Sequence, residues 1–496
     1  MCPFNESMRT RRHDLSDDFE VVSSPRKGAQ PYDPSLSWED YATKYLEFTD
    51  TAPTVYHAID YISKGLKDAG FKYLSERESW EERLQPGGKY FTTRNGTAYC
   101  AFVIGKSWKP SNGAGIVGTH TDSLASILKP SSKKDQVDGY ELLGVAPYAS
   151  GGVGPTWWDR DLGIGGRLVV RDGNGVRTKL VRSPHPIARI PTLAPHFGAV
   201  ANGPFNPETQ QVPIVGLVDE NEKLVPTAEE SKSPLIDKHS LRLLRAISNY
   251  SGVAVKDILE FDLQLFDTQP AALGGLDKEF IFSPRIDDKI CTFTAYEGII
   301  EAADEIAKGS TLGIVAGYDN EEIGSLSRQG ARGNLLESVI DRVLGDIAES
   351  IKKVFYANSF FVSADVNHAV NPNFSNVYLE HHKPKLNVGV TLSRDPNGNM
   401  ITDGLSASFI YELGRRTGNQ IQQFQIRNDS RSGGTIGPGL SAKTGLRGVD
   451  LGIPQLSMHS IRATTGSKDV WLGVRFFKSF YEAWSEVDAE FKLGDL

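Results

Sequence analysis

The sequence predicts an α/β fold in which a central mixed sheet is flanked by helices and carries an inserted, mostly β domain. Apolar runs of strand length, at 98–104 and 312–316, alternate with longer helical patterns such as 289–307. Between about residues 128 and 270 this alternation stops, and short strand-like pieces, glycines and prolines replace it. The alternation resumes near Phe280. An α/β unit interrupted by a β-rich insertion accounts for all three observations.

Composition narrows the functional classes. The 496 residues suffice for two or three domains, and 39% hydrophobic content provides a large core. The net charge of −8, without a basic run, argues against nucleic-acid binding. Three separated cysteines form neither a disulfide framework nor a Cys-type zinc site, which indicates a reducing compartment. No stretch resembles a signal peptide or a membrane span, so we expect synthesis in the cytoplasm.

The N-terminal region predicts a tail and then a scaffold helix. Residues 1–35 are polar and mixed in charge, which is typical of a flexible tail, and 1–30 show no helical apolar period. In the helix we expect Thr51 as the cap, Pro53 in the first turn and Gly70 just past the end. Its apolar face comprises Val55, Ile59, Ile62, Leu66 and Ala69.

A histidine and an aspartate follow the strand-like run 114–118. His120 stands where the strand gives way to a loop, and Asp122 lies two residues on. Metal-binding imidazoles usually donate their other ring N–H to a carboxylate or carbonyl. Asp122 suits that role, and it equally suits orientation of Glu321. A His-x-Asp motif standing alone is more often an ordinary strand end.

The predicted insertion contains one clear hairpin and one unusual histidine. Strand-like runs at 167–171 and 176–181 flank Asp172-Gly173-Asn174-Gly175, a typical turn sequence. His196 lies in the apolar, proline-rich segment 190–197. Composition alone assigns this histidine no role beyond a packed loop.

Two adjacent glutamates, Glu321 and Glu322, follow the apolar run 312–316. On a turn both carboxylates can face one pocket, so that one binds a metal while the other carries a proton. An acidic loop by itself is more often simply solvated. The two glutamates therefore indicate a metal site only if other segments of the chain place further metal ligands beside them.

Three more candidate metal ligands lie at the ends of predicted strands or at the start of a predicted helix. Asp365 follows the run 359–364, and His459 follows 451–458. Asp287 precedes a helix, where it is either an N-cap or a carboxylate that touches two metals. Ligands bind beyond the carboxyl ends of strands in open α/β sheets. Such a set of histidines and carboxylates suits zinc or a similar ion, and two metals roughly 3.5–4 Å apart would offset the repulsion among the acids.

Six motifs, in order, resemble those of the aspartyl aminopeptidase family of di-zinc metallo-aminopeptidases, and most of all its fungal vacuolar branch. They are His-Thr-Asp at 120–122, Arg-Ile-Asp-Asp at 285–288, Tyr-Asp-Asn-Glu-Glu-Ile-Gly-Ser at 318–325, Ser-Ala-Asp-Val-Asn-His at 363–368, Gly-Gly-Thr-Ile-Gly-Pro at 433–438 and Met-His-Ser-Ile-Arg at 458–462. The resemblance runs from about residue 40 to the C-terminus. It implies a zinc exopeptidase-like catalytic domain from 36–127 and 271–496.

The resemblance also implies roles for individual residues. His120, Asp287, Glu322, Asp365 and His459 would bind two zinc ions per subunit, with Asp287 bridging. Glu321 would be the general base and Asp122 the partner that orients it or His120. The insertion, 128–270, would be a dimerisation and oligomerisation domain within a tetrahedral dodecamer, sending His196 into a neighbour's active site. His368 would lie near the substrate.

One departure from the family bears on specificity. Relatives that prefer aspartyl substrates carry a lysine where Val388 stands, so we expect a preference for neutral, apolar N-terminal residues such as leucine. Lys385 lies close enough in sequence to replace that cation, which leaves an acidic preference as the alternative. The resemblance further implies the vacuole as destination and an autophagy receptor as partner.

Two rival functions remain open. A di-metal deacylase or carboxypeptidase would need a clamp for the substrate carboxylate, and Arg462 beside His459 is the candidate. A non-catalytic autophagy cargo or assembly protein would not need a complete ligand set with Glu321 retained.

Overall fold

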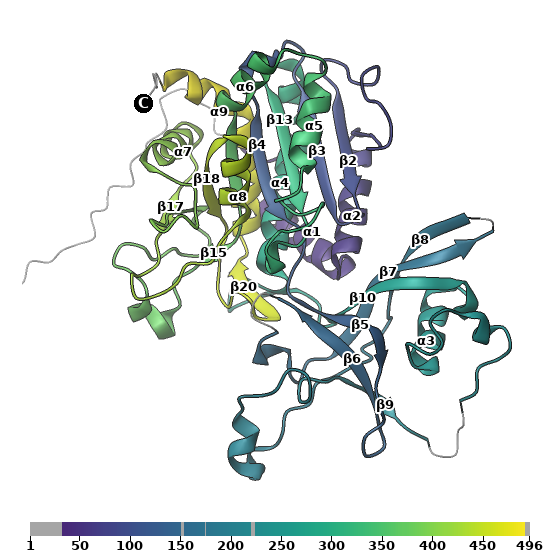
Figure 1. Ribbon diagram of the computed structural model, residues 1–496. Coiled ribbons are helices and arrows are strands. Elements are labelled where there is room, and N and C mark those ends of the chain that lie inside the picture. Colours follow the sequence, from purple (N-terminus) through teal and green to yellow (C-terminus); the bar gives the residue numbers. More distant parts are fainter. Residues whose placement is uncertain (1–31, 150–152, 174, 220–223, 492–496) are drawn as a thin grey trace, which may run out of the picture.

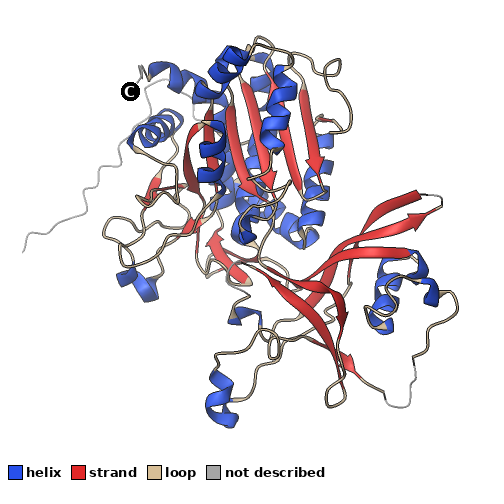
Figure 2. Cartoon of the chain, viewed as in Figure 1, coloured by secondary structure: helices blue, strands red, loops and turns tan. Residues whose placement is uncertain are grey.

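The computed structural model describes residues 32–149, 153–173, 175–219 and 224–491. Two sheets dominate the molecule: a large one sandwiched between helices, and a smaller one that extends away from it (Figure 1). Figure 2 shows that most helices cover the large sheet, whereas the smaller sheet is more open. The predicted α/β fold with a central mixed sheet is confirmed.

Nine strands of the described residues form the large sheet, in the order β1-β2-β3-β13-β4-β14-β18-β16-β17. At its centre β13, β4, β14 and β18 are mutually parallel, while β3 and β16 run antiparallel to their inner neighbours. The strands are β1 (Lys72–Tyr73), β2 (Lys89–Arg94), β3 (Ala98–Ile104), β4 (Gly115–His120), β13 (Leu312–Tyr318), β14 (Phe360–Ala364), β16 (Thr391–Ser393), β17 (Gln422–Phe424) and β18 (Arg447–Gly452).

Helices cover both faces of this sheet. One face packs against α1 (Trp38–Thr51), α2 (Val55–Asp68), α4 (Ile286–Lys308), α7 (Gly404–Thr417) and α9 (Asp469–Glu490). The other packs against α5 (Leu335–Leu344), α6 (Glu349–Ala357) and α8 (Ile436–Thr444). In β13 Val315 enters the first core, whereas Ile314 and Ala316 enter the second. Successive side chains of a central strand enter cores on opposite faces of the sheet. Because both faces are buried, the central strands are continuous apolar runs in the sequence.

Most of the smaller sheet falls in residues 128–270, the predicted insertion, although β5 begins three residues earlier, at Ala125. Its order among the described strands is β8-β7-β10-β5-β6-β9, with antiparallel neighbours throughout. Together with α3 (Leu241–Ser251) it encloses its own apolar core. The strands are β5 (Ala125–Lys133), β6 (Tyr140–Tyr148), β7 (Leu162–Asp172), β8 (Gly175–Arg182), β9 (Ile214–Leu217) and β10 (Ile258–Asp267). The predicted hairpin is β7–β8.

Short strands connect the two parts and flank the carboxyl edge of the large sheet. They are β11 (Ala272–Gly274), β12 (Phe280–Pro284) and β20 (Arg462–Gly466), with the parallel pair β15 (Asn367–His368) and β19 (Pro454–Gln455). No helix in the described part of the chain is both long and apolar enough to cross a membrane.

Two details near the N-terminus differ from the predictions. Thr51 was the expected cap of the second helix, but it is the last residue of α1. The cap is Thr54, whose hydroxyl accepts the backbone N–H of His57. The predicted tail, 1–35, lies mostly outside the described residues. Within it, Tyr32 packs against the core and the Ser35 hydroxyl donates to Glu301.

Candidate active site

Strand register brings three predicted site segments to one edge of the large sheet. His120 ends β4 and pairs with Tyr318, the last residue of β13, so Glu321 and Glu322 follow immediately beyond it. On the other side of β4, β14 ends at Ala364 and Asp365 comes next. Because these strands are parallel, their carboxyl ends meet at the same place.

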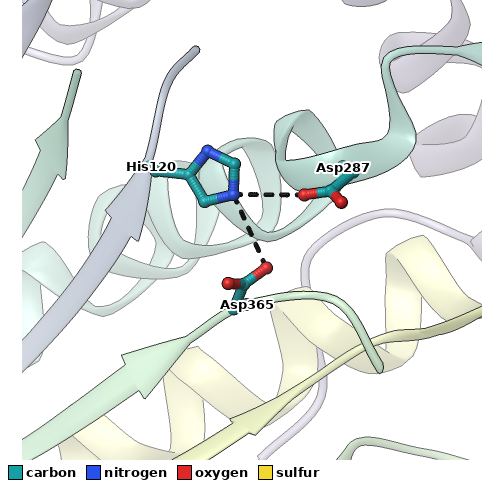
Figure 3. Close-up of side chains that lie close together, drawn as sticks. All are labelled: His120, Asp287 and Asp365. Atoms are coloured by element: carbon teal, nitrogen blue, oxygen red, sulfur yellow. Dashed lines mark hydrogen bonds and ion pairs between the residues drawn. The ribbon is translucent and has the colours of Figure 1, made fainter. Parts of the chain in front are cut away.

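His120, Asp287 and Asp365 form a compact cluster (Figure 3). The Nε2 atom of His120 lies 3.1 Å from Oδ1 of Asp287 and 3.6 Å from Oδ1 of Asp365. The second oxygen of Asp287, Oδ2, lies 3.6 Å from Nε2 of His459. Asp287 therefore faces a different imidazole with each carboxylate oxygen, an orientation suited to a ligand shared by two metals.

Asp287 does not act as a helix cap. It lies in the first turn of α4, where its φ and ψ of −77° and 113° are not helical, and Arg285, at the cap position, makes no side-chain cap hydrogen bond. Ser123 holds the segment by donating its hydroxyl to the backbone carbonyl of Asp287 at 2.6 Å. The N-cap alternative is therefore wrong, and the side chain is directed at the histidines instead.

Asp122 connects the cluster of His120, Asp287 and Asp365 to the turn that carries the two glutamates. Its Oδ1 accepts the backbone N–H of Glu321 and its Oδ2 that of Glu322, both at 3.2 Å. Oδ1 also lies 3.4 Å from Nδ1 of His120. Asp122 is 3% exposed, so these interactions are shielded from water. Asp122 thus lies between His120 and the segment that carries Glu321, and its role in orienting either of them stays a prediction.

Two contributors to the site, Tyr148 and Asp288, escaped the sequence prediction. Tyr148, at the end of β6, donates its hydroxyl to Oδ2 of Asp122 at 2.8 Å and accepts from Nδ2 of Asn320 at 2.8 Å. Asp288 is buried and accepts the backbone N–H of His120 at 3.2 Å. Asp288 belonged to a quoted motif, whereas nothing in the sequence near Tyr148 indicates an active-site residue.

Burial and mutual repulsion shift the proton affinities in the cluster. Burial is the largest influence on Glu321 and raises its pKa to about 8, with Asp365 adding to the rise and His120 opposing it. Burial also raises the pKa of Glu322 and of Asp365. For His120 burial lowers the pKa, but Asp365 and the other carboxylates outweigh it, and the net pKa lies well above its ordinary value.

This donor set fits divalent zinc. Imidazole nitrogens and carboxylate oxygens are ligands that zinc accepts, and cations would relieve the repulsion among the buried acids. The ligand atoms of His120, Asp287 and Asp365 all lie within 4.8 Å of one another. Glu322 lines the same cavities as Asp287 and His459.

A cleft of about 580 Å³ opens beside the cluster. Glu321 and His368 both line it. Its apolar lining includes Val366, Met400, Phe424, Ile426, Leu451 and Met458. Arg332 is the only lysine or arginine among the described residues that line it. Neither Val388 nor Lys385 is among those lining residues, although Val388 lies only three residues before β16.

A family model for the aminopeptidase I zinc metalloproteases, M18, matches residues 48–481. The chain belongs to this family. It is a zinc-dependent aminopeptidase, as its six motifs predicted.

Several M18 relatives cover nearly the whole chain. Vacuolar aminopeptidase 1 of Saccharomyces cerevisiae is 48% identical, over 92% of this chain and 90% of its own. The aspartyl aminopeptidase of Aspergillus oryzae is 40% identical, over 90% and 96%. The mApe1 dodecamer structure from S. cerevisiae is 44% identical with a TM-score of 0.83, over 92% and 99%. The Ape4–Nbr1 complex contains a chain that is 37% identical with a TM-score of 0.87, over 92% and 88%.

The positions of two histidines, His459 and His196, differ from those of the other predicted site residues. His459 was expected to follow directly on one strand-like run, 451–458, but it lies past β19 in the turn before β20, with a φ of 65°. The run that precedes it is broken because β18 ends at Gly452 and Pro454 starts β19. His196 is exposed on the 3-10 segment Pro195–Asn202 and does not line the cleft of its own chain.

Arg462, the clamp required by a carboxypeptidase, is already engaged. Its guanidinium donates to Oδ2 of Asp267 at 3.1 Å and to the backbone carbonyls of Gln269, Pro270 and Phe282. Its side chain is only 13% exposed. These contacts leave it unsuited to a substrate carboxylate, which removes the structural basis of that rival for this M18 chain.

Proposed function

We propose that this aminopeptidase holds two zinc ions per subunit and releases N-terminal residues from peptides with Glu321 as general base. The proposed ligands are His120, Asp287, Glu322, Asp365 and His459. The observation that carries the proposal is the orientation of Asp287, whose two oxygens lie 3.1 Å and 3.6 Å from the Nε2 atoms of the two histidines. A carboxylate shared in this way is the feature that two metals require and one does not.

The side chains divide the chemistry among themselves. Bound zinc supplies Lewis acidity, which acidifies water and polarises the scissile carbonyl. The Glu321 carboxylate accepts a proton from the attacking water, and the same carboxyl group then donates that proton to the leaving amine. Burial raises the pKa of the Glu321 carboxyl group above its ordinary value, which favours its holding the proton between the two steps. Asp122 accepts the backbone N–H of Glu321, and this hydrogen bond limits how far the Glu321 carboxylate can move.

The charge of the cleft suits a free N-terminus. Five carboxylates line it, from Asp287, Glu321, Glu322, Asp365 and Asp450. Bound zinc would offset the charge of the three that are proposed ligands, and we expect a nearby carboxylate that binds no zinc to recognise the free α-amino group of the peptide, so that the enzyme acts from the N-terminal end. A leucyl peptide should therefore be cleaved, whereas the same peptide with an acetylated N-terminus should not.

We propose a preference for neutral, apolar N-terminal residues such as leucine. The apolar lining of the cleft supports it, together with valine rather than lysine at position 388. An acidic side chain would leave a charge poorly paired, which costs several kcal/mol when buried. Arg332 is the observation that favours the alternative, an aspartyl preference, since it offers one cation in the cleft.

Assembly and location follow the relatives. We infer a tetrahedral dodecamer, a vacuolar destination and recognition by an autophagy receptor, as the mApe1 dodecamer, vacuolar aminopeptidase 1 and the Ape4–Nbr1 complex suggest. The exposed His196 is available to enter a neighbour's cleft, and residues 128–270 would form the oligomerisation domain. The assembly mass and the turnover of wild type and of His196→Ala test the dodecamer and the role of His196. We expect the variant to keep the mass of the assembly and to lose turnover.

A further inference from the structure

The smaller sheet reaches the active site through Tyr148. In the antiparallel pairing of β5 with β6, Tyr148 lies opposite Ala125, and Ala125 comes only three residues after Asp122. This register places the Tyr148 hydroxyl beside the Asp122 carboxylate. A slip of one residue would turn Tyr148 to the other face of the sheet, so the contact depends on correct strand pairing.

The Tyr148 hydroxyl links both ends of the turn that carries Glu321. It donates to Oδ2 of Asp122, the same oxygen that accepts the N–H of Glu322. It also accepts from Asn320, the residue directly before Glu321, at 2.8 Å. Asn320 has a φ of 63°, a left-handed conformation that needs support from its surroundings.

Asn320 receives that support from two sides. Its Oδ1 atom accepts from the Ser327 hydroxyl at 2.7 Å and from Nε2 of Gln329 at 3.1 Å, while its Nδ2 atom donates to Tyr148. Removing the hydroxyl would leave Nδ2 without this acceptor and Asp122 with one donor fewer. A general base works only within hydrogen-bond reach of the proton that it takes. A small displacement of the turn that carries Glu321 should therefore lower the rate of the reaction.

We propose that Tyr148 is a positioning residue of the reaction, which acts through Asp122 and Asn320 to hold Glu321 in place. The inference rests on the proposed role of Glu321 as base. It makes the second sheet part of the catalytic apparatus as well as a candidate surface for assembly. Other contacts already join the two parts of the chain, such as Arg462 with Asp267 and Arg182 with the carbonyl of Asp50, so Tyr148 is not required merely to attach the sheet.

The test is Tyr148→Phe in the full-length, zinc-loaded protein, with leucyl-peptide hydrolysis, zinc content and assembly mass as readouts. We expect kcat to fall roughly ten- to a hundred-fold, as for loss of a hydrogen bond to a charged group, with KM, zinc and mass unchanged. Tyr140→Phe, at the exposed start of the same strand, is the matched control and should retain full turnover.

Each other outcome has a definite meaning. An unchanged kcat in Tyr148→Phe overturns the inference, and so does a fall in turnover that merely tracks lost zinc or a dissociated assembly. Glu321→Gln is measured in parallel. If that variant keeps its turnover, the proposed function itself is wrong; if it is inactive while Tyr148→Phe is fully active, only the role of Tyr148 is wrong.

Discussion

The Oδ1 atom of Asp287 lies 3.1 Å from Nε2 of His120, although 167 residues separate them in the sequence. The contact forms because β4 ends where α4 begins, at the carboxyl edge of the large sheet. We predict that Asp287→Asn lowers the zinc content and abolishes turnover, because an amide cannot offer two anionic oxygens. Elemental analysis of the purified protein measures the zinc.

Asp288→Asn is the matched control for that variant. Asp288 contacts the backbone N–H of His120, not its ring, so an amide oxygen can replace the carboxylate. We expect zinc to remain bound in Asp288→Asn. Full zinc content in Asp287→Asn would contradict the bridging role.

The cleft predicts a ranking of substrates. Leucyl peptides should be hydrolysed with kcat/KM on the order of 100-fold higher than aspartyl peptides, since an acidic side chain meets an apolar, carboxylate-rich cleft. Arg332→Gln should reduce the remaining aspartyl hydrolysis while sparing the leucyl reaction. Arg328→Gln, in the same loop but not lining the cleft, should change neither. A wild-type preference for aspartyl peptides would refute the ranking.

A helix cap offers a test of local structure. Thr54 caps α2 by accepting the N–H of His57, whereas the Thr51 hydroxyl donates back to the carbonyl of Glu47 inside α1. Thr54→Ala should lower the free energy of unfolding by about 1 kcal/mol. Thr51→Ala should cost less, because it removes no cap. Chemical denaturation compares the two, and equal losses would mean that Thr54 contributes nothing special.

Asp469 predicts a pH dependence of stability. Burial raises its pKa from 3.8 to about 7 in the folded chain, against backbone donors from Asn387 and Gly466. The folded state then binds the extra proton, so this group's contribution falls as pH rises from about 4 to about 7, by up to about 1.4 kcal/mol per pH unit. Above pH 7 the contribution is constant.

Asp469→Asn isolates this effect. The stability of the variant relative to the wild type should rise between pH 4 and pH 7, as followed by denaturation midpoints at several pH values. A difference that stays flat over this window would show that Asp469 is ionised in the folded chain throughout it.

Local patterns predicted much of the fold and of the site. Central strands such as β3 and β13 are continuous apolar runs, and the chemistry-bearing residues His120, Glu321 and Asp365 lie at or just beyond the ends of strands. The strands and these residues could therefore both be predicted from the sequence. The first helix, α1, was missed because its buried face is partly aromatic and polar, including Tyr41, Tyr45 and Thr49.

Long-range contacts were the part that the sequence concealed. Tyr148 reaches Asp122 only through the register of β5 and β6, which no local pattern encodes. Arg462 looked available beside His459, but contacts from segments near 267–270 and 282 occupy it. Such contacts depend on tertiary packing, which composition and periodicity do not determine.

The most direct test of the central claim is zinc stoichiometry together with leucyl-peptide hydrolysis in wild type and in Glu321→Gln. The account predicts two zinc ions per subunit in both proteins, with turnover lost only in the variant, since a glutamine neither accepts nor returns the proton. Substantial turnover in Glu321→Gln, or a single zinc ion in the wild type, would contradict it.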